Sequence, residues 1–274
     1  MWNPIPCIAL MFLFLATVAC DTDTKQQPAN KDMVLLTDQQ ISSLASKRIF
    51  FGHQSVGDNI LQGIRDLKAS DPRLTLNLVS SADPETISGP AFIETHIGVN
   101  RNPDSKNDAF YAILQKGYGA QHGIALYKYC YIDFNPSTDV QQVFSKYRDG
   151  IASLKQRYPT LMIVHVTVPL YEDEPGEGLQ QCSRTFLRRL LRRDPNIQRN
   201  EFNELLIRTY SGKEPIFDLA KVESTHVDGS RCYYRRGTQK IYTLAPEFTT
   251  DGGHLNEIGR KVVATQLLSV LANL

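Results

Sequence analysis

The chain of 274 residues is long enough to bury a large apolar core, and its 42% hydrophobic content is typical of a globular protein. Its 30 Lys and Arg residues are nearly balanced by 29 Asp and Glu residues. This balance argues against the positive field with which nucleic-acid-binding proteins attract phosphates, so we expect no nucleic-acid partner.

The N-terminus predicts export. Residues 8–19 form an apolar run that is too short for a membrane span and typical of the apolar part of a signal peptide. Small Ala19 then precedes Cys20, which resembles the lipobox of bacterial lipoproteins, where the Cys is acylated; an uncleaved N-terminal anchor is the alternative. We expect a signal peptide over 1–19, a lipidated tether over 20–34 and one domain over 35–274. This predicts a bacterial cell-envelope protein, lipid-anchored through Cys20 or periplasmic or extracellular.

The cysteines do not form a metal or disulfide framework. Once Cys7 and Cys20 are set aside with the signal and the lipid, Cys130, Cys182 and Cys232 remain, an odd number without CxxC spacing. A bridge between Cys182 and Cys232 stays open. Cys130 lies in an apolar run, so we expect it in the core.

Apolar runs alternate along the chain with segments of helical periodicity. Strands are predicted over residues 48–52, 74–81, 123–133, 161–170 and 215–222, and helices over 37–47, 56–70, 108–118, 138–159, 200–211 and 255–274. Residues 81–108 and 223–250 are polar and are expected to be loops. The Arg-rich stretch 184–194 reads as a helix with a solvated face or, alternatively, an anion site. The alternation predicts an α/β fold with three αβα layers and a doubly wound, five-stranded, mainly parallel sheet.

Ligands of open parallel sheets collect at the carboxyl ends of the strands, so reactive residues at those ends are the candidates for a site. They are His53 and Ser55 after the first strand, His96, Gly98 and Asn100 after the second, Tyr131 and Asp133 after the third, Tyr171 after the fourth, and Asp251 and His254 before the last helix.

Three of these residues could perform nucleophilic catalysis. A serine hydroxyl needs a base, and an imidazole base works best when a carboxylate holds its other nitrogen. Asp251 and His254, three residues apart on a turn, could supply that pair for Ser55. In the alternative interpretation, Asp251 and Ser55 only cap the helices that follow them.

Two sequence blocks resemble the SGNH/GDSL hydrolases. "DGGHLN" is similar to the C-terminal Asp-x-x-His block of that family, and "FFGHQSVGDN" places Ser55 in its nucleophile position. The resemblance covers roughly residues 47 to 274. It implies a flavodoxin-like fold and a catalytic triad in which Ser55 attacks, His254 is the base and Asp251 orients His254.

The other blocks depart from the family pattern. Gly52 and Ser55 are separated by His53-Gln54 instead of a single Asp, and "KYCYID" offers Asp133 without the Asn that donates to the oxyanion. Losing one such donor typically costs about 2.7–4 kcal/mol of transition-state stabilisation. We expect Gly98 and Asn100 to replace it, although both could simply form a turn.

The remaining candidates are expected to shape the pocket. These are His53, Gln54, Tyr131 and Asp133. His53 could instead bind a metal with His96, Asp251 or His254, but no HxH or HxxxH pair supports this, so we expect no metal and no other cofactor.

The predicted function is an exported, monomeric serine esterase that hydrolyses small acyl esters such as O-acetyl groups on carbohydrate. Two alternatives stay open. The first is an O-acyltransferase on the same fold, and the second is a non-catalytic glycan-binding or scaffold lipoprotein.

Overall fold

The computed structural model describes residues 36–173 and 194–274, which belong to the compact unit Met33–Leu274. The predicted signal peptide, the tether with Cys20, nearly all of the Arg-rich stretch and Cys182 lie outside the described residues. Their structure and the predicted domain boundary therefore stay predictions.

A parallel sheet forms the centre of this unit and confirms the α/β class. Its strand order is β2-β3-β1-β4-β5-β6, with every neighbouring pair parallel. The expected number of five strands was wrong, because the sheet formed by the described residues has six. The strands are β1 (Arg48–His53), β2 (Leu78–Ser80), β3 (Ala91–His96), β4 (Gly123–Tyr127), β5 (Leu161–Val166) and β6 (Ile216–Phe217).

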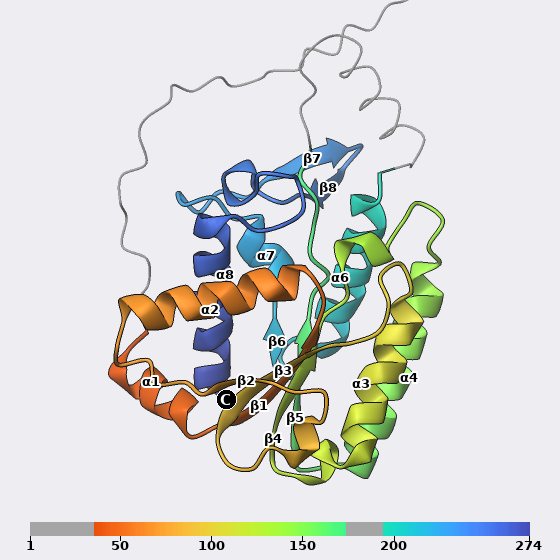
Figure 1. Cartoon of the computed structure of the whole chain (residues 1–274). Coiled ribbons are helices and arrows are strands. Elements are labelled where there is room, and N and C mark those ends of the chain that lie inside the picture. Colours follow the sequence, from red (N-terminus) through yellow and green to blue (C-terminus); the bar gives the residue numbers. More distant parts are fainter. Residues whose placement is uncertain (1–35, 174–193) are drawn as a thin grey trace, which may run out of the picture. The chain divides into compact units, whose positions relative to one another are not determined.

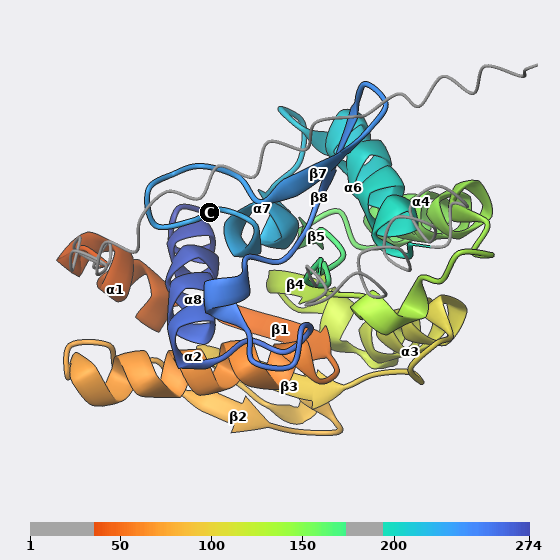
Figure 2. The same cartoon turned by 90° about the horizontal axis from the view of Figure 1, so that it is seen from above.

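Helices cover both faces of the sheet, as expected for three layers. In Figure 1, α1, α2 and α8 lie on one side of the strands and α3, α4 and α6 on the other, and Figure 2 shows the same division from above. The helices are α1 (Asp38–Ala45), α2 (Val56–Ser70), α3 (Pro103–Lys116), α4 (Val140–Arg157), α6 (Asn196–Tyr210), α7 (Leu219–Glu223) and α8 (Glu257–Ala272).

Alternation along β1 explains why both faces are covered. Ile49 and Phe51 belong to the apolar core beneath α2 and α8, whereas Phe50 belongs to the core beneath α3 and α4. All three side chains are at most 1% exposed. Because successive strand residues point to opposite faces, a run that is apolar throughout fits only a strand buried on both sides.

The sixth strand comes from a segment that was expected to be a loop. Residues 81–108 are rich in Gly, Pro and Asn, but Ala91–His96 forms β3 beside β1. Its first three residues are apolar and buried, Glu94 is also buried, and only the last two residues become partly exposed. The parallel register pairs His53 with His96, which brings two histidines from distant sequence positions to one end of the sheet.

The C-terminal excursion also contains regular structure. Residues 223–250, expected to be a loop, include the antiparallel hairpin of β7 (Tyr233–Arg236) and β8 (Gln239–Tyr242). Four short 3-10 helices complete the described chain: Pro84–Thr86, Tyr118–Ala120, Tyr131–Asp133 and Pro246–Phe248. In the part of the chain that the structure describes, no helix combines the length and apolarity that crossing a bilayer requires.

Candidate active site

Ser55 lies on a strained turn between β1 and α2. Its backbone has φ 34° and ψ −84°, a positive φ that residues other than Gly seldom adopt. It occupies the N-cap position, but within the described helix α2 its side chain makes no cap hydrogen bond. The hydroxyl lies 3.9 Å from the thiol of Cys130. Capping of α2 therefore does not explain the position of the Ser55 hydroxyl.

Asp251 and His254 form a hydrogen-bonded unit, which we call the Asp251–His254 pair. Asp251 Oδ2 lies 2.6 Å from His254 Nδ1, and Asp251 Oδ1 accepts from the backbone N–H groups of Gly253 and His254. Partial burial raises the pKa of the Asp251 carboxyl, but these hydrogen bonds outweigh it and hold the pKa well below its ordinary value. The N-cap of α8 is Asn256 and not Asp251, so the Asp251 carboxylate is available to orient His254.

Several contacts hold the Ser55 turn near the Asp251–His254 pair. Asn59 Oδ1, one turn into α2, accepts from the backbone N–H of Leu255 at 3.1 Å. The ring of Tyr131 lies edge-on to that of His254, with centroids 5.8 Å apart, and Tyr131 follows Cys130 in the chain. Within the described residues, no hydrogen bond joins Ser55 to His254. The complete triad stays a prediction.

The two expected oxyanion residues lie in one loop after β3. Gly98 has φ +59°, and its carbonyl accepts from the side chain of Gln54. Asn100 Oδ1 faces Lys106 Nζ at 3.3 Å, and because an ammonium can only donate, the amide N–H groups of Asn100 point away from Lys106. Their role at the oxyanion stays a prediction.

The expected pocket residues divide into two groups. Tyr131 lines a cavity, whereas Gln54 fixes the loop after β3 by donating to the carbonyls of Ile97 and Gly98. Asp133 does not line the pocket: its side chain is fully buried, because it pairs with buried Lys106 at 2.7 Å. His53 is also fully buried, so it contributes from beneath the site and not from a pocket wall.

Sequence reasoning missed the buried charged residues under the site. Lys128 Nζ lies 3.5 Å from Cys130 Sγ, and burial lowers the pKa of Lys128. Glu223 is also buried, which raises its pKa to about 8, although it accepts a hydrogen bond from the N–H of Leu170. The sequence signal was a Lys inside the apolar run after β4, and such a residue is seldom buried without a partner.

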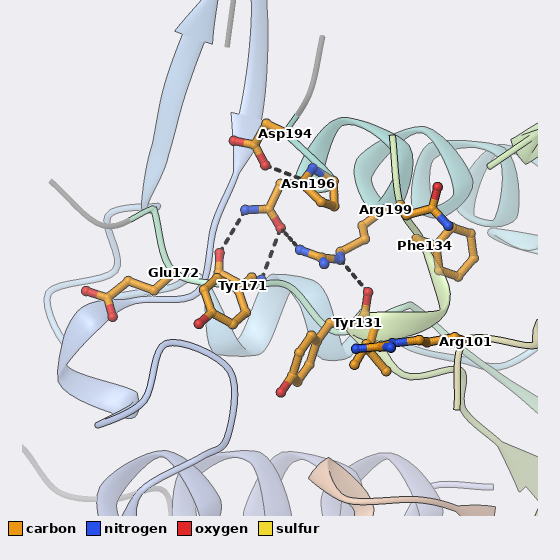
Figure 3. A pocket seen from close by; sticks show the side chains of 11 residues that line it. Arg101, Tyr131, Phe134, Tyr171, Glu172, Asp194, Asn196 and Arg199 are labelled. Carbon is orange, nitrogen blue, oxygen red and sulfur yellow. Dashed lines mark hydrogen bonds between the residues drawn. The ribbon is translucent and has the colours of Figure 1, made fainter. Parts of the chain in front are cut away.

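A cavity of about 340 Å³ lies next to the Asp251–His254 pair, and Figure 3 draws the side chains that line the cavity. Its two tyrosines connect it to that pair: Tyr131 packs against His254, and the Tyr171 hydroxyl donates to the carbonyl of Asp251 at 3.0 Å. The lining residues are Arg101, Tyr131, Ile132, Phe134, Asn135, Tyr171, Glu172, Asp194, Pro195, Asn196 and Arg199.

Arg199 is a buried cation among the charged residues that line this cavity. Figure 3 shows its guanidinium between Tyr131 and Asn196, to which it donates at 2.8 and 2.7 Å. Burial lowers its pKa to about 10, which leaves it protonated at neutral pH. The cavity thus combines aromatic walls with charges of both signs, since Glu172 and Asp194 also line it, and this lining suits a polar ring.

Of three comparisons with known proteins, only the comparison with solved structures found similar proteins. No family model matches the chain, and no curated protein matches it significantly. One similar solved structure is a GDSL-like lipase from Bacteroides thetaiotaomicron, with 11% identity and a TM-score of 0.49 over 82% of this chain and 87% of that chain. An acetyl xylan esterase has 14% identity and a TM-score of 0.41 over 80% of this chain and 96% of that chain. A family 3 carbohydrate esterase from Clostridium thermocellum has 13% identity and a TM-score of 0.38 over 80% of this chain and 92% of that chain. At these identities and TM-scores, the likeness assigns neither a family nor an activity to this chain.

Proposed function

We propose that the chain is an exported serine esterase that hydrolyses small acyl esters, with O-acetyl groups on carbohydrate as the preferred class. The observation that carries the proposal is the Asp251–His254 pair, which holds an imidazole at the end of the sheet where Ser55 lies on a strained turn. A serine in that setting is a candidate nucleophile because its side chain is not used as a helix cap.

The hydrogen bond to Asp251 fixes the tautomer of His254. An ionised carboxylate can only accept, so Nδ1 carries the proton and Nε2 presents its lone pair. In the proposed reaction, Nε2 takes the Ser55 hydroxyl proton while Oγ attacks the ester carbonyl carbon. The tetrahedral intermediate expels the alcohol, which leaves with the proton from His254. Water then repeats the sequence on the acyl-serine and releases the acid.

The reaction requires Ser55 to turn its hydroxyl from Cys130 toward His254. Such hydrogen bonds are often long without substrate and tighten in the complex. Gly98 and Asn100 are the proposed oxyanion donors, and the Cys130 thiol is a further, weak donor next to Ser55.

The cavity beside the pair is the proposed binding site of the alcohol portion. Tyr131 and Tyr171 would stack against a sugar ring, and Arg199 stands where it could meet a carboxylate or hydroxyl of that ring.

The test is fluorophosphonate labelling combined with hydrolysis of p-nitrophenyl acetate. The parent should be labelled and active, Ser55→Ala should lose the label, and Ser55→Ala and His254→Ala should each lose activity by roughly 10³-fold or more. Ser42→Ala, which removes an exposed serine on α1, is the matched control and should match the parent.

A folded parent that takes no label would contradict the esterase proposal and favour the glycan-binding alternative. Retention of full activity by both variants would contradict the assigned residues. Products formed with an added sugar acceptor separate hydrolysis from acyl transfer.

The proposal also includes export, with the chain anchored to the membrane by lipid on Cys20. Incorporation of labelled palmitate into the parent and its loss in Cys20→Ser is the expected result, and equal incorporation in both would contradict lipidation at this residue.

A further inference from the structure

Three potential metal ligands converge at the ends of β1 and β3. The register pairs His53 with His96, and Asp58 in the first turn of α2 reaches both. Asp58 Oδ1 lies 2.8 Å from His96 Nε2 and 3.8 Å from His53 Nδ1. The three ligand atoms all lie within 4.8 Å of one another. With Glu94, these residues form what we call the β1–β3 cluster.

The buried member of the cluster is held in the orientation that a ligand needs. Glu94 Oε2 lies 2.8 Å from His53 Nε2, which makes the Glu94 carboxylate the hydrogen-bond partner of that ring nitrogen. Because the ionised carboxylate can only accept, Nε2 carries the proton, which leaves a lone pair on Nδ1. A carboxylate behind an imidazole is how proteins orient metal-ligating histidines.

That lone pair has no partner in the described structure. The His53 side chain is completely buried, and its Nδ1 has no hydrogen bond among the described residues. Buried polar atoms are nearly always paired. An unpartnered His53 nitrogen that faces an oxygen of Asp58 and a nitrogen of His96 therefore indicates that these three atoms share a ligand.

Gly57 allows α2 to pack closely against the His53 ring. A Cβ added at Gly57 would lie 2.5 Å from His53 Nδ1, so any larger residue there would crowd the ring. On the other side, Asp58 and His96 have about half of their side chains exposed, at 51% and 56%. The donor atoms are thus buried at one end and open to solvent at the other.

We propose that His53 Nδ1, Asp58 Oδ1 and His96 Nε2 bind one divalent transition-metal ion of the Zn²⁺ class. Ligand atoms at bonds of about 2.0–2.1 Å in a tetrahedron are roughly 3.4 Å apart, which small side-chain rotations of the observed atoms reach. Two imidazoles favour Zn²⁺ and its neighbours over Mg²⁺ or Ca²⁺, which prefer oxygen ligands. The exposed side leaves the fourth position to water or an external ligand.

The site would secure the turn that carries Ser55. His53 and Asp58 stand on either side of Ser55, so one ion would bind both ends of the strained segment and join it to β3. The binding proposal does not rest on the esterase proposal, since the ion can bind whether or not Ser55 is a nucleophile.

Titration with Co²⁺ after removal of metal by a chelator tests the proposal directly. The parent should bind one Co²⁺ with the visible absorption of a nitrogen- and oxygen-ligated ion, and Zn²⁺ should displace it. His96→Ala and Asp58→Asn, both exposed positions that the fold does not need, should each weaken binding by about 100-fold or more. Glu94→Gln should weaken it by about 10- to 100-fold, as loss of a supporting carboxylate does.

A matched control comes from another histidine–carboxylate contact. His226 Nδ1 lies 2.7 Å from Glu247 Oε1 without belonging to the cluster, and His226→Ala should bind Co²⁺ like the parent. Circular dichroism confirms that each variant is folded.

Three results would overturn the proposal. They are a parent that shows no saturable Co²⁺ binding, His96→Ala and Asp58→Asn variants that bind like the parent, and a loss of binding in His226→Ala as large as that in His96→Ala. None of these results depends on esterase activity.

Discussion

The β1–β3 cluster and the Asp251–His254 pair contain the same unit, a histidine whose ring nitrogen is held by a carboxylate. They differ in which nitrogen is held and in surroundings. In the cluster, Nε2 is held and the ring is fully buried; in the pair, Nδ1 is held and the side chain is 41% exposed.

This difference matters because the second nitrogen decides the chemistry. In the cluster, the second nitrogen faces Asp58 and His96, which each offer one ligand atom for a cation. In the pair it is Nε2, at the end of an open imidazole beside the cavity and the Ser55 turn. The same unit can therefore orient a ligand in one place and a base in the other.

The largest expected effect is a loss of activity that distinguishes the Asp251–His254 pair from the β1–β3 cluster. Asp251→Asn should lower kcat for p-nitrophenyl acetate by about 10⁴-fold, because an amide no longer favours the tautomer with a lone pair on Nε2. Co²⁺ binding should be unchanged. Asp139→Asn, which alters an exposed helix cap, is the control and should keep its kcat. Equal kcat values for the parent and Asp251→Asn would show that the pair is not catalytic.

A medium effect concerns the packing of the cluster alone. Gly57→Ala places a Cβ within 2.5 Å of the His53 ring and should lower the free energy of unfolding by about 1–3 kcal/mol, measured in urea. In a His53→Gly background the same change should be neutral or stabilising, because both the Cβ and the ring of residue 53 are gone and Ala favours helices. Additive effects of the two changes would contradict the close approach of α2 to His53.

The smallest expected effect is on the pH dependence of stability in metal-free protein. Burial lowers the pKa of His53 from its ordinary value of 6.5, so the unfolded chain takes up a proton first and stability falls as pH drops through that value. The lowered pKa of Asp251 costs stability only as pH falls below about 3.8. Between about pH 7 and pH 5, urea unfolding should therefore show the parent losing stability relative to His53→Gln, whereas the raised pKa of Glu223 changes the stability of both proteins equally.

Two outcomes would count against that difference. His53→Gln could show the same loss as the parent over this range, or the NMR titration of the His53 ring in the parent could give a pKa at or above 6.5.

The fold could be predicted wherever the apolar residues of a helix or strand recur with a clear period. The helix expected over 56–70 is α2 itself, because its apolar residues recur at helical spacing. Helix α3 begins at Pro103, five residues before the expected start, since Asn102 caps it and Pro is favoured in the first turn. Strand β3 was missed because its apolar part, Ala91–Ile93, is only three residues long and follows Gly-Pro.

The site was less predictable because it depends on register. Asp251 and His254 are near in sequence, so their pairing could be expected from spacing. His53 and His96 are 43 residues apart on strands of which one was missed, so no spacing rule could bring them together. Cys130 was expected in the core; it is buried, but its sulfur also faces Ser55.

The hydrogen bond from Leu255 to Asn59 has a consequence for synthesis of the protein. It joins residues 196 positions apart, so the ribosome has made most of the chain before the contact can form. Until the last helix emerges, a nascent chain carries Ser55 without His254. A chain truncated before residue 254 would retain every strand of the described sheet yet lack the proposed base, so the proposed activity would have to wait until synthesis is nearly complete.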